Sequence, residues 1–163
     1  MEKVTYLAGG CFWCMEGQLI GVPGILDIKS GFSGGDEKDV TYEIVKKQLT
    51  GHEETVKIVY DDTRISFLDI LNEYIKVIDP LDNEGQFIDK GNSYKCAIFY
   101  QNEEEKRIAK KVKSDLTISL NHEVYIDIVP FKFFIQAGDE HQEFYKKFEK
   151  EYQEELIASG RKK

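Results

Sequence analysis

The chain has 163 residues, enough for one domain of ordinary size and too few for two. An apolar content of 41% argues against a disordered chain, and a net charge of −8 argues against a general nucleic-acid binder. No apolar run approaches the ~20 residues of a membrane span, and residues 4–8 are too few for a signal-peptide core. We therefore expect a single domain over residues 1–163, in the cytoplasm and away from membranes.

The first half of the chain predicts three strands that alternate with three helices. Gly9 and Gly10 end the first strand, and Pro80 ends the third helix. The expected elements are strand 3–8, a helix from about Cys11, strand 25–31, helix 42–49, strand 54–60 and a helix opened by Ser66 in a motif that resembles a capping box.

The second half begins with a stretch of almost no periodicity, residues 81–93, which predicts a long and therefore functional loop. The remaining elements are expected as strand 94–100, helix 103–116, strand 124–129 and a final helix 140–156. Strands interleaved with helices, some joined too briefly for parallel crossovers, predict an α+β fold. We expect a mixed β-sheet with helices packed on it.

The three cysteines, Cys11, Cys14 and Cys96, cannot all pair within one chain and indicate reactive or buried thiols. The two glycines before Cys11 let the backbone leave a strand sharply, so this residue is expected at a helix N-terminus. The N–H groups and the dipole of a helix stabilise an anion there, which predicts a lowered thiol pKa and a nucleophilic thiolate. Phe12 and Trp13 would form an apolar wall beside the sulfur.

The spacing of Cys11 and Cys14 is that of redox dithiols, but alone it is not specific. It also suits buried core thiols, a zinc site or a thioredoxin-like oxidoreductase, and the aromatic residues would suit a non-catalytic binder of methionine-rich peptides. Zinc takes four ligands, and only Cys96 and three scattered histidines remain to complete them. We therefore expect no metal.

Gly10-Cys11-Phe12-Trp13 resembles the signature of the A-type peptide methionine sulfoxide reductases. Further matches follow in the order and approximate spacing of that family: Gly31-Phe-Ser-Gly-Gly35, Thr41-Tyr42, Thr50-Gly-His-Glu-Glu54-x-Val56, Tyr60-Asp61, Asp79-Pro80, Asp89-x-Gly91-x-x-Tyr94 and His141-Gln142. The resemblance spans nearly the whole chain. It implies a two-layer α/β sandwich of ferredoxin-like type with additional elements.

The resemblance implies an enzyme that reduces methionine S-sulfoxide, free or in proteins, and so repairs oxidative damage. The Cys11 thiolate would attack the substrate sulfur, Glu54 would protonate the oxygen, and Cys11 would be left as a sulfenic acid. Neighbours on a strand face opposite sides, so Glu54 is a better candidate than Glu53 for the side buried with Val56 and Ile58. A dithiol such as thioredoxin would restore the enzyme, with no metal, flavin or nicotinamide cofactor.

The remaining roles are also implied by the family pattern. Tyr42 and Tyr94 would hydrogen-bond the sulfoxide oxygen, and Asp89 would order the site. Phe12 and Trp13 would receive the methyl group of the substrate and so select the S epimer. His52 and His141, which fall in matching motifs, are expected to be structural.

The partner thiol for recycling is left open by the sequence. Many family members carry recycling cysteines in a C-terminal tail, whereas no cysteine follows Cys96 here. Cys14 is the favoured candidate because it is close to Cys11, although an i, i+3 pair in a helix needs local adjustment to form a disulfide. Cys96 is the second candidate, because on a strand it would share a face with Tyr94.

Overall fold

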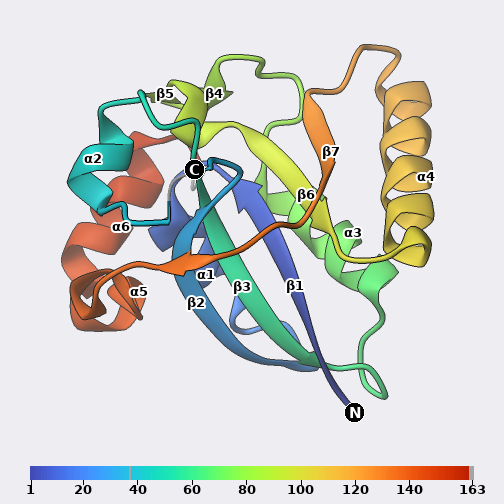
Figure 1. Ribbon diagram of the computed structural model, residues 1–163, viewed down its shortest axis with the longest axis horizontal. Helices are drawn as coiled ribbons and strands as arrows, with labels where there is room; N and C mark the ends of the chain where they lie inside the picture. The colour runs from blue at the N-terminus through green and yellow to red at the C-terminus, as the bar shows by residue number, and fades with distance from the viewer. Residues whose placement is uncertain (37, 162–163) are drawn as a thin grey trace.

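The computed structural model describes residues 1–36 and 38–161 (Figure 1). Its main strands are β1 (Glu2–Gly9), β2 (Ile25–Ser33), β3 (Glu53–Asp61), β6 (Cys96–Tyr100), β7 (Ile126–Pro130) and β8 (Ile135–Gln136). These described strands form one sheet in the order β7-β6-β1-β3-β2-β8, in which β6 and β7 pair in parallel and the other neighbours pair antiparallel. The prediction of a mixed sheet is confirmed.

The helices are α1 (Phe12–Leu19), α2 (Tyr42–Lys46), α3 (Phe67–Val77), α4 (Glu103–Leu120), α5 (Phe144–Lys147) and α6 (Glu149–Ala158), with 3-10 turns η1 (Asn92–Tyr94) and η2 (Asp139–His141). Helices α1, α3 and α4 contact the strands of the sheet, and Leu7 and Ile98 belong to the core cluster that they share with it. This is the expected α+β arrangement. No helix in the described part of the chain has the length and hydropathy needed to cross a bilayer.

Strands β7 and β8 form the two edges of the sheet. The segment that connects them crosses the face of the sheet opposite the helices and covers it (Figure 1). There the ring of Phe131 stacks on that of Tyr6 with centroids 3.9 Å apart. A Cβ on Gly31 would collide with Phe134 and with the carbonyl oxygen of Ile135, so glycine lets the crossing segment reach β2. The two-residue strand β8 was not predicted from the sequence.

The capping box that opens α3 is confirmed. The Ser66 hydroxyl accepts a hydrogen bond from the Asp69 N–H at 3.0 Å, and the Asp69 carboxylate accepts one from the Ser66 N–H at 3.2 Å. An aspartate therefore performs the role that glutamate or glutamine more often takes.

The predicted final helix 140–156 is wrong, because the chain there forms η2, α5 and α6 instead. The break falls at Glu143, whose φ of 51° is left-handed. The N–H of Glu143 donates a 2.9 Å hydrogen bond to Oε1 of Glu16 in α1. This tertiary contact stabilises a backbone conformation that the helical periodicity does not predict.

The predicted loop 81–93 holds a small hairpin of β4 (Gly85–Gln86) and β5 (Asp89–Lys90), followed by η1. The prediction that Tyr94 begins a strand is wrong. Tyr94 ends η1, where its N–H donates to the carbonyl oxygen of Gly91 at 3.1 Å, and strand β6 begins at Cys96.

Candidate active site

Cys11 lies in the turn between β1 and α1. It is the N-cap residue of α1 and is 5% exposed. Gly10 before it has a φ of 86°, a left-handed conformation that glycine adopts readily, and a Cβ there would lie 2.7 Å from Cβ of Gln86. The prediction that a helix begins near Cys11 is confirmed.

A cavity of about 230 Å³ opens at Cys11. Its lining combines residues from α2, β3, β5, η1 and α6 with those at the start of α1: Cys11, Trp13, Tyr42, Lys46, Glu54, Asp89, Tyr94 and Glu155. All the residues predicted as catalytic are therefore brought together, along with Trp13.

Two residues of this lining, Lys46 and Glu155, were not predicted from the sequence. Glu155 follows Tyr152 by three positions, and residues at this spacing are neighbours on the surface of a helix. Tyr152 is buried against the cysteines of the site, so its spacing from Glu155 is a signal that could have identified this residue.

Phe12 is not among the residues that line this cavity, so a contact of Phe12 with the substrate's methyl group stays a prediction. Its side chain is fully buried, with its ring centroid 6.0 Å from that of Tyr42 and 5.7 Å from that of Phe32. Phe12 thus supports the ring of Tyr42, and Trp13 provides the apolar wall of the cavity.

Residues of η2 and α5 fix the position of the Trp13 indole. Its Nε1–H donates to Nδ1 of His141 at 3.2 Å, and its ring stacks on Phe144 with centroids 4.1 Å apart. Burial lowers the pKa of His141, so the imidazole is neutral at pH 7 and Nδ1 is free to accept this hydrogen bond.

Glu54 is an acid held in its neutral form. Its side chain is 2% exposed, and Oε1 accepts a hydrogen bond of 3.1 Å from the N–H of Phe12. Burial, followed by the nearby Cys11 thiol, raises the pKa of Glu54 well above its ordinary value, although the Phe12 N–H opposes this shift. A carboxyl group of this kind can deliver a proton near pH 7.

The two tyrosines keep their hydroxyl protons as well. Burial, with the charge of Glu54 as the next cause, raises the pKa of both Tyr42 and Tyr94. The Tyr94 side chain also affects the pKa of Tyr42, and both tyrosines line the cavity, so the two hydroxyls lie close together on its wall. They are donors for an oxygen bound beside Glu54.

The expectation of a lowered pKa for Cys11 is wrong. Its contact with the Cys14 thiol, followed by burial, raises the pKa of the Cys11 thiol well above the ordinary value. These effects outweigh the stabilisation that the N-terminus of α1 offers to an anion. The protonated thiol therefore dominates near pH 7, and an attack by this sulfur requires a group that takes the proton.

The model of the peptide methionine sulfoxide reductase family matches residues 3–163. The chain belongs to this family. Peptide methionine sulfoxide reductase MsrA 2 of Staphylococcus aureus (strain MW2) is 44% identical over 163 residues, which cover 99% of this chain and 92% of that protein. The family resemblance drawn from the sequence motifs is thus confirmed, and the chain is an oxidoreductase that reduces methionine sulfoxide.

Two solved structures have the same fold. Mxr1 from Saccharomyces cerevisiae in its reduced form has a TM-score of 0.87 at 25% identity, over 91% of this chain and 87% of that one. Methionine sulfoxide reductase A of Corynebacterium diphtheriae has a TM-score of 0.80 at 25% identity, over 90% of this chain and 74% of that one. The predicted fold class is confirmed.

The three thiols of this reductase are free, and they lie in two different environments. Cys11 and Cys14 form an apolar cluster with Tyr152 and Leu156 of α6. Cys96 is 2% exposed in the main core, where burial raises its thiol pKa to about 12. The argument that Cys96 shares a strand face with Tyr94 fails, because Tyr94 lies outside the strand.

One sulfur and two carboxylates come close together in the reductase cavity. The Cys11 Sγ and one carboxylate oxygen each of Asp89 and Glu155 lie within 4.8 Å of one another. Among residues 1–36 and 38–161, no other histidine, cysteine, aspartate or glutamate joins this group. The group is thus one short of the four protein ligands that a closed zinc site takes.

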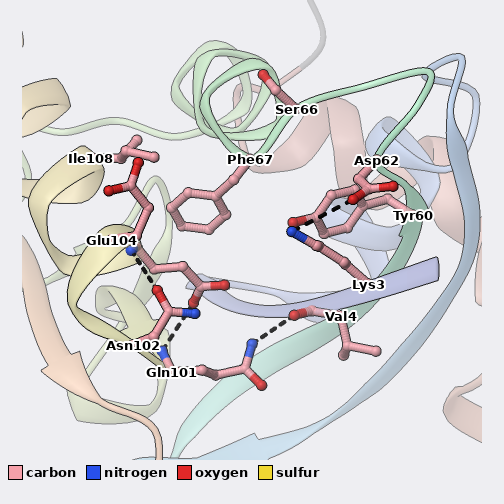
Figure 2. A pocket seen from close by; sticks show the side chains of 11 residues that line it. Lys3, Val4, Tyr60, Asp62, Ser66, Phe67, Gln101, Asn102, Glu104 and Ile108 are labelled. Carbon is pink, nitrogen blue, oxygen red and sulfur yellow. Dashed lines mark hydrogen bonds and ion pairs between the residues drawn. The ribbon is translucent and has the colours of Figure 1, made fainter. Parts of the chain in front are cut away.

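A larger groove of about 620 Å³ lies at the opposite end of β1 and β3, where Lys3, Tyr60 and Phe67 contribute to its lining (Figure 2). Its polar groups bond mostly to one another. The Gln101 side chain donates to the Val4 carbonyl oxygen at 2.6 Å, and Lys3 pairs with Asp62 at 3.5 Å. No cysteine lines this groove, so the redox chemistry belongs to the cavity at Cys11.

Proposed function

We propose that this reductase acts on the S epimer of methionine sulfoxide, free or in oxidised proteins, with Cys11 as its nucleophile. One observation carries the proposal: the Cys11 sulfur and the neutral Glu54 carboxyl line the same small cavity. Reduction by attack at sulfur needs both a sulfur nucleophile and an acid for the oxygen.

In the first step, Sγ of Cys11 attacks the sulfoxide sulfur while Glu54 gives its proton to the oxygen. Tyr42 and Tyr94 donate hydrogen bonds to that oxygen, and Trp13 packs against the substrate's methyl group. The oxygen then passes from the substrate's sulfur to Sγ of Cys11 as the substrate's S–O bond and the transient bond between the two sulfurs break. Methionine leaves, and Cys11 becomes a sulfenic acid. Asp89 orders the site beside the sulfur.

In the second step, Cys14 condenses with the Cys11 sulfenic acid and water leaves. Cys14 is supported in this role because it packs in the same apolar cluster as Cys11. Cys96 lies in the main core instead, which argues against Cys96 as the partner thiol. A dithiol of the thioredoxin type then reduces the disulfide, and no cofactor takes part. Yeast Mxr1 has also been solved in complex with Trx2, which supports a thioredoxin as the partner.

A cytoplasmic location and a single catalytic domain over residues 1–163 stay predictions.

The test is a turnover assay with each epimer of methionine sulfoxide and dithiothreitol as the reductant. We expect methionine from the S epimer only, and none in Cys11→Ser. Full activity in Cys11→Ser would rule out the proposed nucleophile, and equal turnover of the R epimer would rule out the proposed selectivity.

A further inference from the structure

Glu155 of α6 lies beside the sulfur of Cys11 and next to Asp89 of β5. We propose that Asp89 and Glu155 form a carboxyl pair that shares one proton, and that this pair exchanges protons with Cys11. The pair takes the thiol proton when Cys11 attacks the sulfoxide, and it returns a proton to the hydroxyl group that leaves Cys11 when the disulfide forms. This inference rests on the proposed function and assigns Glu155 to that reaction.

A proton acceptor is needed because the Cys11 thiol is protonated and almost inaccessible to water. Its exposed fraction is 5%, and burial together with the Cys14 contact keeps its pKa high. Glu54 cannot accept this proton, because the same step requires it to donate one to the oxygen. Asp89 and Glu155 each place a carboxylate oxygen within 4.8 Å of the sulfur.

Two carboxylates this close to each other do not ionise independently. When like charges share a site, the first carboxyl ionises easily and the second retains its proton. Burial raises the pKa of both Asp89 and Glu155, and for Glu155 the charge of Asp89 is the next cause. Oδ2 of Asp89 is buried and has no hydrogen-bond partner among the described residues, so it is available to hold a proton.

The other charged and titratable groups around the pair come from five elements or segments. Arg161 opposes the rise in pKa at both carboxyls, and Lys46 and Lys90 oppose it at Asp89. The remaining titratable groups of the cavity are Tyr42, Glu54 and Tyr94. The cations therefore keep one member of the pair ionised, and that member is the acceptor.

The position of Glu155 is fixed by the way α6 is held. Tyr152 and Leu156, on the same helix, pack in the cluster with Cys11 and Cys14. Just after the helix, Arg161 donates from Nη2 to the carbonyl oxygen of Gly9 at 2.7 Å and from Nη1 to that of Val77 at 2.8 Å. The segment that carries Glu155 is thus tied to the chain just before Cys11.

The protons balance over the two steps. In the first, the Cys11 thiol proton passes to the pair and the Glu54 proton passes to the oxygen, which leaves Cys11 as a sulfenic acid. In the second, Cys14 forms the S–S bond, the hydroxyl leaves with the proton from the pair as water, and the proton that Cys14 loses replaces the one from Glu54. Cys11 and Cys14 are oxidised together, and the sulfoxide is reduced to methionine.

The test is the pH dependence of the first turnover of the S epimer in Glu155→Gln, which keeps the size of the side chain and removes its proton exchange. We expect methionine formation near pH 7 to slow about tenfold, since Asp89 remains and a general base contributes 10²–10⁴-fold. The deficit should narrow as the pH rises, because Cys11 then ionises without help. The sulfenic acid, trapped with dimedone, should also persist longer than in the unmodified enzyme.

Two variants of the same helix complete the experiment. Glu154→Gln removes a neighbouring exposed carboxylate and should match the unmodified enzyme, while Glu155→Asp keeps a carboxyl group and should recover part of the rate. A Glu155→Gln rate equal to that of the unmodified enzyme, or a deficit that does not change with pH, would overturn the proposal. An unmodified enzyme that forms no methionine would instead refute the proposed function.

Discussion

The main-chain N–H of Phe12 donates a hydrogen bond of 3.1 Å to Oε1 of Glu54, so the residue after the nucleophile holds the acid. The backbone at the start of α1 and the central strand β3 therefore fix the position of the Glu54 carboxyl relative to the Cys11 sulfur. Glutamine at position 54 keeps an oxygen that can accept this N–H. Glu54→Gln therefore removes the acidic proton and keeps the hydrogen bond from the Phe12 N–H.

Glu54→Gln should slow methionine formation by about 100-fold or more, the range that a general acid contributes. In the unmodified enzyme, activity should fall as the pH rises through the raised pKa of Glu54, because only the protonated carboxyl donates. Single-turnover formation of methionine as a function of pH measures both effects. Glu53→Gln, which removes the neighbouring buried acid, should keep the rate within about twofold; an equal loss in both variants would contradict the assignment.

Cys14→Ser should form one methionine per enzyme and then stop when thioredoxin is the reductant, because no disulfide can form at Cys11. Cys96→Ser should continue to turn over, since Cys96 lies in the main core. Peptide mass spectrometry after oxidation by the substrate should find Cys11 bonded to Cys14. A Cys11–Cys96 bond, or a persistent sulfenic acid with both other thiols free, would overturn the role of Cys14.

Glu53→Gln should flatten the pH dependence of stability. Burial, followed by the charge of Asp127, raises the pKa of Glu53 to about 8. Between the ordinary pKa of 4.5 and about 8, the native state holds a proton that the unfolded state has lost. The free energy of unfolding therefore falls with rising pH, by up to about 1.4 kcal/mol per pH unit from this group.

Urea unfolding at pH 6 and at pH 9 measures this effect. The unmodified enzyme should lose more stability between the two pH values than Glu53→Gln, and the variant should be the more stable of the two at pH 9. Parallel pH profiles for the two proteins would show that Glu53 titrates normally in the folded chain.

Arg161→Ala should destabilise the protein by about 2 kcal/mol, because the partly buried carbonyl oxygens of Gly9 and Val77 lose charge-assisted hydrogen bonds. It should also speed alkylation of Cys11 and Cys14, since α6 then covers them less firmly. Arg107→Ala is the matched control: its ion pair with Glu104 is exposed, so the loss should stay below about 1 kcal/mol. Equal losses in both variants would contradict the role given to Arg161.

Much of the fold follows from short-range patterns. Val56 and Ile58 alternate along β3 and are fully buried, as a strand of the core requires. The break before α5 has no such pattern, because it depends on a bond between Glu16 and Glu143, which lie 127 positions apart. The crossing to β8 likewise depends on the close approach to Gly31.

The site was predictable where its residues fall in motifs, and unpredictable where it depends on packing. Cys11, Glu54 and Tyr94 were found from their motifs and line one cavity. The high pKa of the Cys11 thiol could not be predicted, because the rule for helix N-termini does not include the buried Cys14 beside it. Glu155 reaches the cavity only because α6 packs over the two cysteines.

The guanidinium contact of Arg161 has a practical consequence for purification. It places Arg161 against Gly9, close to the Cys11 sulfur, whereas Met1 is 82% exposed at the other end of β1 (Figure 1). An affinity tag fused after position 163 would begin three positions beyond Arg161. It would therefore disturb the hydrogen bonds that Arg161 donates to Gly9 and Val77. A tag on Met1 would disturb only the surface ion pairs of its ammonium group with Asp61 and Asp62. An affinity tag should therefore be placed at the N-terminus.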